Sequence, residues 1–345
     1  MNDTAIQEET LPSEAELAHL AERAISPPLV THIYTADPSA HVFEGRLYIY
    51  PSHDIESGGA FDDEGGHFGM EDYHVLRMDS PGGEVTECGM ALHVRDVPWA
   101  DKQMWAPDAA CREGRYYLYF PAKDGGGLFR IGVAVADRPE GPFVAEPAPI
   151  DGAYSIDPAV FEDDDGTHYL YFGGIWGGQL QKYRDNAYDA AHEEPVGDAP
   201  ALGPRVGRLD TGMTTLAEAT REIVILDEHG QPLRADDHAR RFFEGPWVHK
   251  YAGRYYLSYS TGNTHLLCYA VGDSPYGPFT YGGVILEPVV GWTTHHSICA
   301  FDGQWYLFYH DALLSGGVTH LRSVKCTPLH HEADGRIRTI DPYGG

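Results

Sequence analysis

The chain has 345 residues, a length that suits either two domains or one large all-β or barrel domain. Its 52 acidic and 24 basic residues give a net charge of −28 at pH 7, which repels nucleic acid and anionic membrane surfaces and favours a neutral substrate. No stretch approaches the roughly 18 consecutive apolar residues of a membrane span, so we expect neither a nucleic-acid partner nor a membrane partner.

Residues 1–27 are predicted to form an N-terminal extension with one short helix. Ser13 and Glu16 match a capping box. The apolar residues that follow at helical spacing are Leu17, Leu20, Ala21 and Ala24. The extension is acidic and lacks a basic region followed by an apolar run, so it does not match a secretory signal and we expect a cytoplasmic protein.

One pattern then occurs five times: a polar or acidic residue, an apolar strand, a turn with glycine, and a second strand rich in aromatic residues. The copies span residues 37–54, 106–122, 156–174, 242–260 and 295–311. Strand-like segments at 73–80, 130–143, 266–279 and 319–328 follow four of them. The spacing leaves room for about four strands per copy, as in propeller blades. We therefore predict an all-β protein whose residues 28–345 form a single five-bladed β-propeller.

The residues just before the five hairpins are the strongest candidates for a site. They are Asp37, Asp108, Asp157, Glu244 and His295. In a propeller the innermost strand of each blade starts at one end of the central channel, so we expect these side chains to converge there. The alternative for each acidic residue is an ordinary solvated turn.

Carboxyl groups that converge from different blades suit glycoside hydrolysis, which needs a carboxylic acid and a carboxylate on opposite sides of the scissile bond. Glu244 lies between Phe242, Phe243 and Trp247 in the sequence. Apolar surroundings raise the pKa of a carboxyl group toward the range of a general acid.

These segments resemble glycoside hydrolase family 43, a family of five-bladed propellers. The motifs that carry the resemblance are TADPSAHVF, SIDPAVFEDDDG, FFEGPWV, TTHHSICAF and THLRSV. The resemblance implies that Asp37 is the general base that activates water, that Glu244 is the general acid, and that Asp157 orients the acid and tunes its pKa. It also implies inversion, for which the carboxyl groups of Asp37 and Glu244 should lie roughly 6.5–9.5 Å apart.

The resemblance further implies that His295 faces a metal ion, usually Ca²⁺, or a cluster of water molecules in the channel, with most ligands supplied by water. His296 is the alternative ligand, and a purely structural histidine is the alternative to a metal site. One imidazole is weak evidence for Ca²⁺ because this ion prefers oxygen ligands. No organic cofactor is expected.

Substrate contacts are expected from residues near the same channel end. Arg322 of THLRSV matches an arginine at the substrate-binding end, where its charge would help to keep Asp37 ionised. Trp105 and Trp176 are candidates for stacking on a sugar, whereas Trp247 and Trp292 are more typical of a core.

Asp108 and the pair His53 and Asp54 complete the predicted substrate-binding set. His53 and Asp54 lead into a Gly- and acid-rich loop at residues 55–72. A loop of this length is usually functional or disordered. It is predicted either to wall off the site, which would limit the enzyme to chain ends, or to be a plain surface loop.

The sequence thus predicts an inverting, exo-acting hydrolase of short plant cell-wall oligosaccharides, with β-D-xylosidase favoured over α-L-arabinofuranosidase or arabinanase. A retaining fructosidase-like enzyme and a non-catalytic carbohydrate-binding propeller remain as alternatives. Many β-xylosidases of the family carry a C-terminal β-sandwich that helps to close the pocket. Here a neighbouring subunit of a homo-oligomer, or the 55–72 loop, would have to take that role.

Overall fold

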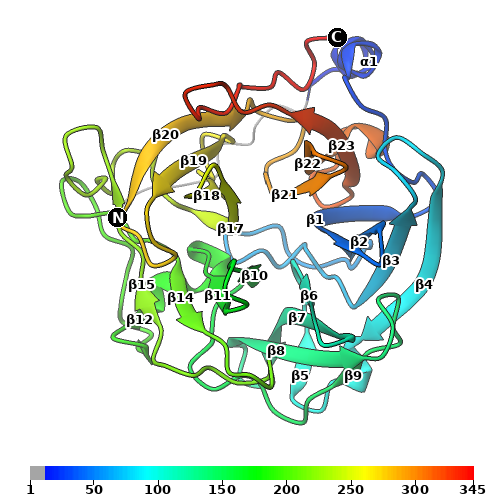
Figure 1. Cartoon of the computed structure of the whole chain (residues 1–345). Helices are drawn as coiled ribbons and strands as arrows, with labels where there is room; N and C mark the ends of the chain where they lie inside the picture. Colours follow the sequence, from blue (N-terminus) through cyan, green and yellow to red (C-terminus); the bar gives the residue numbers. More distant parts are fainter. Residues whose placement is uncertain (1–11) are drawn as a thin grey trace.

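The computed structural model describes residues 12–345, and five sheets surround a central axis in it (Figure 1). The first sheet contains β1 (Tyr34–Phe43), β2 (Arg46–Asp54), β3 (Asp72–Met78) and β4 (Val85–His93). The second contains β6 (Asp108–Arg112), β7 (Arg115–Asp124), β8 (Phe129–Ala136) and β9 (Val144–Ala145), with β5 (Ala100–Lys102) also paired to β7. The predicted all-β, five-bladed propeller is confirmed.

The third sheet contains β10 (Ala159–Glu162), β11 (His168–Phe172), β14 (Arg205–Arg208) and β15 (Arg221–Glu222). The fourth contains β17 (Glu244–Tyr251), β18 (Arg254–Ser260), β19 (Leu267–Gly272) and β20 (Phe279–Leu286), and β16 (Ile225–Leu226) pairs in parallel with β20. The fifth contains β21 (His296–Phe301), β22 (Gln304–Asp311) and β23 (Ser323–Leu329).

Short elements fill the connections. Residues between the third and fourth hairpins form a small sheet of β12 (Tyr183–Arg184) and β13 (Ala187–Tyr188). The 3-10 helices are Val94–Asp96, Trp176–Gly178, Leu180–Lys182 and Leu313–Ser315. The long connection between β11 and β14 within the third blade is irregular, and the five-fold pattern in the sequence does not extend to it.

The five hairpins turn at the predicted glycines. Their φ angles lie in the left-handed region, which glycine adopts at no steric cost. The values are 75° for Gly45, 75° for Gly114, 78° for Gly166, 79° for Gly253 and 78° for Gly303. This turn geometry matches the right-handed twist of the flanking strands, so the hairpins are specified locally by the sequence.

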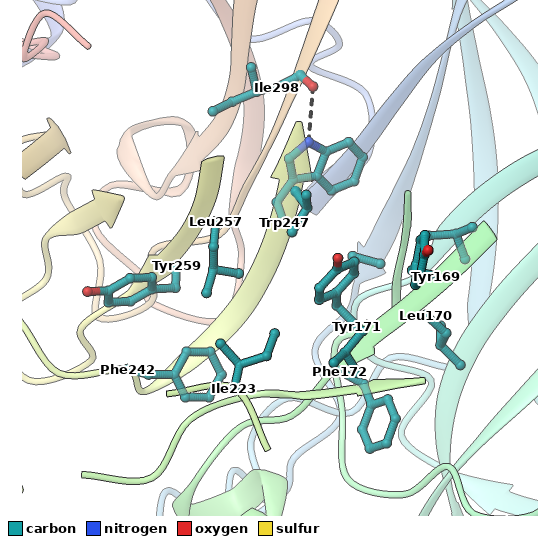
Figure 2. Close-up of a cluster of buried hydrophobic side chains, with 14 of the residues drawn as sticks. Tyr169, Leu170, Tyr171, Phe172, Ile223, Phe242, Trp247, Leu257, Tyr259 and Ile298 are labelled. Carbon is teal, nitrogen blue, oxygen red and sulfur yellow. Dashed lines mark hydrogen bonds between the residues drawn. The ribbon is translucent and has the colours of Figure 1, made fainter. Parts of the chain in front are cut away.

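Neighbouring blades are joined by a core of large side chains (Figure 2). Leu170, Leu257 and Tyr259 are completely buried in it. Trp247 of β17 donates a hydrogen bond from Nε1 to the carbonyl oxygen of Ile298 in β21, at 3.0 Å. Trp247 is therefore a core residue, as predicted, and links the fourth blade to the fifth.

The N-terminal segment completes the fifth blade. The N–H of Leu29 donates to the carbonyl of Val324 at 2.8 Å, and the N–H of Thr35 donates to the carbonyl of Arg322 at 2.9 Å. Residues 29–35 thus lie along β23, whose sheet otherwise has three strands. The ring is closed by hydrogen bonds between the two ends of the chain.

The predicted helix is α1 (Glu14–Arg23), and its capping box between Ser13 and Glu16 is present. Leu17, Leu20 and Ala24 pack on a small cluster near the C-terminus, which lies beside α1 in Figure 1, whereas Ala21 is exposed. The part of the N-terminal extension at residues 1–11 lies outside the described residues. Among the residues described, no helix is long and apolar enough to cross a membrane.

Candidate active site

A pocket at one end of the central channel is lined by residues from all five blades. Asp37, Asp157 and Glu244 all face it, together with His295 and Arg322. The structure therefore brings together three acidic residues that lie far apart in the sequence. The other lining residues include Phe61, Asp62, Phe68, Trp105, Trp176, Phe243, Trp292 and Thr293.

A local backbone distortion points the acidic residues into the pocket. Asp37 and Asp157 have φ angles of 48° and 57°, and each precedes a proline. In the fourth blade Gly245 takes this place, with a φ of 65°, one residue after Glu244. The ladders of β1 and β17 are irregular at these points, and such bulges re-aim side chains beside active sites. Asp37 and Gly245 stand at the same distance before their turn glycines, so Glu244 occupies the position one residue earlier in an equivalent bulge.

Asp37 is held as an ionised carboxylate. Burial favours its neutral form, but the charge of Arg322 outweighs burial and lowers the pKa of Asp37. Arg322 donates from Nη1 to Oδ1 at 3.0 Å and from Nη2 to Oδ2 at 3.3 Å. Ser52 adds a hydrogen bond to Oδ2 at 2.8 Å. Only 5% of Asp37 is exposed, so this carboxylate is fixed in position.

Arg322 is positioned by Asp54. Its Nε and Nη2 donate to the two carboxylate oxygens of Asp54 at 2.8 and 2.7 Å, and its backbone N–H donates to Oδ2 at 2.8 Å. Such a two-point contact fixes the plane of a guanidinium group. Arg322 and Asp54 were both predicted to contact substrate. Arg322 lines the pocket and contacts Asp37, whereas Asp54 does not line it and holds Arg322 in place.

Glu244 and Asp157 form a pair that retains a proton at neutral pH. Burial, followed by the charge of Asp37, raises the pKa of Glu244 to about 8. Burial, followed by the charges of Glu244 and Asp37, raises the pKa of Asp157 well above its usual value. The N–H of Gly245 donates to Oδ2 of Asp157 at 2.9 Å, which links the two groups through the backbone next to Glu244.

His310 orients the backbone of Asp37, and it was not among the residues predicted from the sequence. Its Nδ1 accepts the N–H of Asp37 at 3.0 Å, while Nε2 lies 3.0 Å from the carbonyl oxygen of Thr293. Burial lowers the pKa of His310 to about 3, so the ring is neutral, with Nε2 as donor. The only signal in the sequence was its place near the end of the fifth hairpin.

His295 lies in the pocket wall and His296 does not. Nδ1 of His295 accepts the N–H of His296 at 2.9 Å, so in the neutral ring the proton is on Nε2. That Nε2 is buried and has no hydrogen-bond partner among residues 12–345. It faces the channel as a donor, which suits a water molecule. His296 instead pairs through Nε2 with Ser258 Oγ at 2.6 Å.

The arrangement around His295 fits a hydrated cation or a water cluster. Ca²⁺ takes six to eight oxygen ligands, and a protonated Nε2 has no lone pair for a metal. Oδ2 of Asp157 lies 3.6 Å from Nε2. A calcium ion would therefore fit here with water molecules between it and the imidazole ring.

Aromatic side chains form the rim of the pocket. Trp105 and Trp176 both line it, as does Trp292. The ring centroids of Trp176 and Trp292 lie 5.9 Å apart, and Phe243 meets both rings edge-on. The expectation that Trp292 is a core residue was wrong, because the connection before β21 places it beside Trp176.

The 55–72 loop covers one side of the pocket. Phe61, Asp62, Asp63, Gly65, His67, Phe68 and Met70 of this loop line it. The Nε1 of Trp105 donates to the carbonyl oxygen of Phe68 at 2.8 Å, and the Nε2 of Gln103 donates to that of Gly65 at 2.9 Å. The loop also approaches the third blade, since a Cβ on Gly177 would lie 2.9 Å from the carbonyl oxygen of Glu64. The loop is a wall of the site.

Besides Asp54, two predicted substrate-binding residues lie outside the pocket. Asp108 is completely buried and does not line the pocket. It hydrogen-bonds to Ser39, to His41 Nε2 at 2.6 Å and to the N–H of Val160 at 2.5 Å, so it joins the inner strands of three blades. His53 points from β2 toward Asp72 of β3 and does not line the pocket either.

Comparison with known proteins gives a family. Residues 86–194 match the model of the glycosyl hydrolases family 43. A xylosidase/arabinosidase 43A of Humicola insolens is 63% identical over 91% of this chain and 99% of its own length.

Solved structures agree with this relationship. A family 43 enzyme from Xanthomonas citri in complex with xylose is 72% identical, with a TM-score of 0.93 over 96% of this chain and 98% of the other. A β-xylosidase/α-arabinofuranosidase from a compost metagenome, solved with xylotriose in a calcium-free form, is 62% identical, with a TM-score of 0.91 over 92% of this chain and 98% of the other.

Proposed function

Because this chain belongs to glycosyl hydrolases family 43, we propose that it is an exo-acting β-D-xylosidase that inverts the configuration of the released sugar. It would remove single xylose units from short 1,4-β-xylooligosaccharides. The observation that carries the proposal is the contrast between two carboxyl groups that face one pocket. The pKa of Asp37 is lowered, and that of Glu244 is raised to about 8.

The contrast assigns opposite roles to the two groups. A carboxylate that stays ionised accepts a proton from water, so Asp37 is the proposed general base. A carboxyl group that keeps its proton near pH 7 donates it to the departing oxygen, so Glu244 is the proposed general acid. In an inverting enzyme the water attacks the anomeric carbon as the glycosidic bond breaks, and the proton from Glu244 ends on the leaving hydroxyl.

Asp157 is proposed to position and tune the acid. It is 4% exposed and bonds the N–H of Gly245, directly after Glu244. A negative charge on either group makes ionisation of the other less favourable, so the pair holds its proton to higher pH than a lone carboxyl group. Arg322 and Asp54 keep Asp37 in the opposite state.

The substrate class is inferred from the relatives and from the wall of the pocket. The Xanthomonas structure contains xylose and the compost enzyme contains xylotriose. The loop with Phe61 and Asp62 bounds the pocket on one side, which favours the end of a chain over its middle. The Humicola relative is named for both xylosidase and arabinosidase activity, so α-L-arabinofuranosidase activity is the second candidate.

A substrate panel tests this function. We expect the protein to hydrolyse an aryl β-xyloside and xylotriose, to act more weakly on an aryl α-arabinofuranoside, and to leave an aryl β-galactoside and linear arabinan intact. Xylose should appear from the first time points of xylotriose digestion. NMR of the fresh product should show α-xylose. Net retention would refute inversion, and inactivity on every glycoside would favour a carbohydrate-binding propeller.

We also propose that a hydrated Ca²⁺ occupies the channel beside His295. It would supply fixed positive charge near the carboxylates and order the water molecules there. Thorough chelation is expected to lower the melting temperature or the activity, and Ca²⁺ should restore either one. A His295→Ala variant should no longer respond. A wild-type protein that is unchanged by chelation would indicate a water cluster instead.

A further inference from the structure

A second group of metal-ligand side chains lies on the first blade, outside the pocket. His53 comes from β2, and Asp72 and His74 come from β3. One ligand atom from each residue can be chosen so that all lie within 4.8 Å of one another. None of the three residues lines the pocket.

The three side chains converge on a small space. Nδ1 of His53 lies 2.6 Å from Oδ1 of Asp72, and Nε2 of His74 lies 3.8 Å from Oδ2 of the same carboxylate. The two imidazole rings meet edge-on, with centroids 4.7 Å apart. Two residues apart on one strand, Asp72 and His74 point to the same face of the sheet. The 3.8 Å between Nε2 of His74 and Oδ2 of Asp72 is close to the distance between two neighbouring ligand atoms that each lie about 2.0–2.2 Å from a zinc ion.

A carboxylate on the next strand fixes the tautomer of His74. Oε1 of Glu87 in β4 lies 2.6 Å from Nδ1 of His74. Nδ1 of His74 is therefore the donor, and in the neutral ring Nε2 keeps its lone pair toward Asp72. This carboxylate–histidine arrangement typically supports the ligands of metal sites.

We propose that His53, Asp72 and His74 form a binding site for a transition-metal ion of intermediate softness, of which Zn²⁺ is the expected one. Two imidazole nitrogens and one carboxylate oxygen match the donor set of three-ligand zinc sites, where water completes the coordination. The metal takes the place of the proton between His53 and Asp72. Ca²⁺ is excluded as the preferred ion because it selects oxygen ligands.

The site is reachable from solvent. The side chains of His53, Asp72 and His74 are 19%, 17% and 16% exposed. A bound ion would connect β2 to β3 directly and β4 through Glu87. Since Glu87 also pairs with His32 of the N-terminal segment, the ion would stabilise the place where the propeller ring closes. Its effect is expected on stability more than on turnover.

Binding of Co²⁺ to the purified, metal-free full chain tests the proposal, because Co²⁺ in such a site absorbs visible light. We expect one Co²⁺ per chain with a visible band that Zn²⁺ removes and Ca²⁺ does not, and a higher melting temperature with Zn²⁺. His74→Ala and Asp72→Asn should abolish the band. Glu87→Gln, which leaves the three ligands in place, should weaken binding by about 10–100-fold.

Two controls separate this site from other histidines. His295→Ala removes the channel imidazole and should leave the band unchanged, and so should His229→Ala, whose side chain is 78% exposed. Melting curves of the metal-free variants establish that each is folded. A band that persists in His74→Ala, or that is lost in His295→Ala alone, would overturn the proposal. So would the absence of any band in the wild-type chain.

Discussion

Glu244→Gln is expected to slow the release of xylose from xylobiose by about 10²–10⁴-fold, the usual contribution of a general acid. A sugar alkoxide is a poor leaving group, so the departing sugar needs the proton from Glu244. From an activated dinitrophenyl β-xyloside, the leaving group departs as dinitrophenolate and needs no proton. The rate of its hydrolysis should therefore fall far less. The measurement is kcat/KM for both substrates with the wild type and the variant.

The pH profile provides a second readout for Glu244. The wild type needs this group protonated, so its activity should fall as pH rises through about 8, the pKa to which burial raises this group. In Glu244→Gln this alkaline fall should disappear. Glu162→Gln, at the far end of β10 with a 60% exposed side chain, is the matched control and should behave as the wild type. Equal losses on both substrates would contradict the role as acid.

Asp37→Asn is expected to lower kcat/KM by about 10²–10⁴-fold for xylobiose and for the activated aryl xyloside alike. Water must lose a proton whatever the leaving group, and an amide cannot accept it. The side chain keeps its shape, and Arg322 keeps its two contacts with Asp54. Comparison of the two substrates therefore separates the base from the acid.

Protonation of Asp37 is expected to set the loss of activity at low pH. The pKa of this group is lowered, mainly because the charge of Arg322 outweighs burial. The ionised form thus persists below the usual carboxyl range, and wild-type activity should fall only as pH drops through that lowered pKa. In Asp37→Asn the residual activity should lack this fall. A variant that retained most of its activity would rule out Asp37 as the base.

The hairpins and the acids could be predicted because their determinants are local and repeated. Each turn glycine adopts a left-handed φ angle between two strands, and the acid stands at a nearly constant distance before it. The offset of one residue between Asp37 and Glu244 could not be explained from the sequence, since the two acids occupy adjacent positions of equivalent bulges. Local patterns therefore gave the blades and the catalytic candidates.

The parts that the sequence did not predict depend on contacts between distant residues. His310 of the neighbouring fifth blade bonds the backbone of Asp37, 273 residues away along the chain. Trp292 reaches the pocket through an irregular connection before β21. Asp108 occupies the expected place at the head of its hairpin, but its carboxylate is hydrogen-bonded to Ser39, His41 and Val160 and does not reach the pocket. No local pattern distinguishes these outcomes.

The closure of the ring by Leu29 and Thr35 also affects synthesis. The segment that holds these residues leaves the ribosome first, but its partner β23 follows about 300 residues later, on the order of 15–60 s at typical elongation rates. Until β23 is made, the N-terminal segment has no partner, and an unpaired edge strand is a template for association with other chains. Slow, late docking of the N-terminal segment should therefore limit the yield of folded protein, and truncation before residue 35 should favour aggregation during expression.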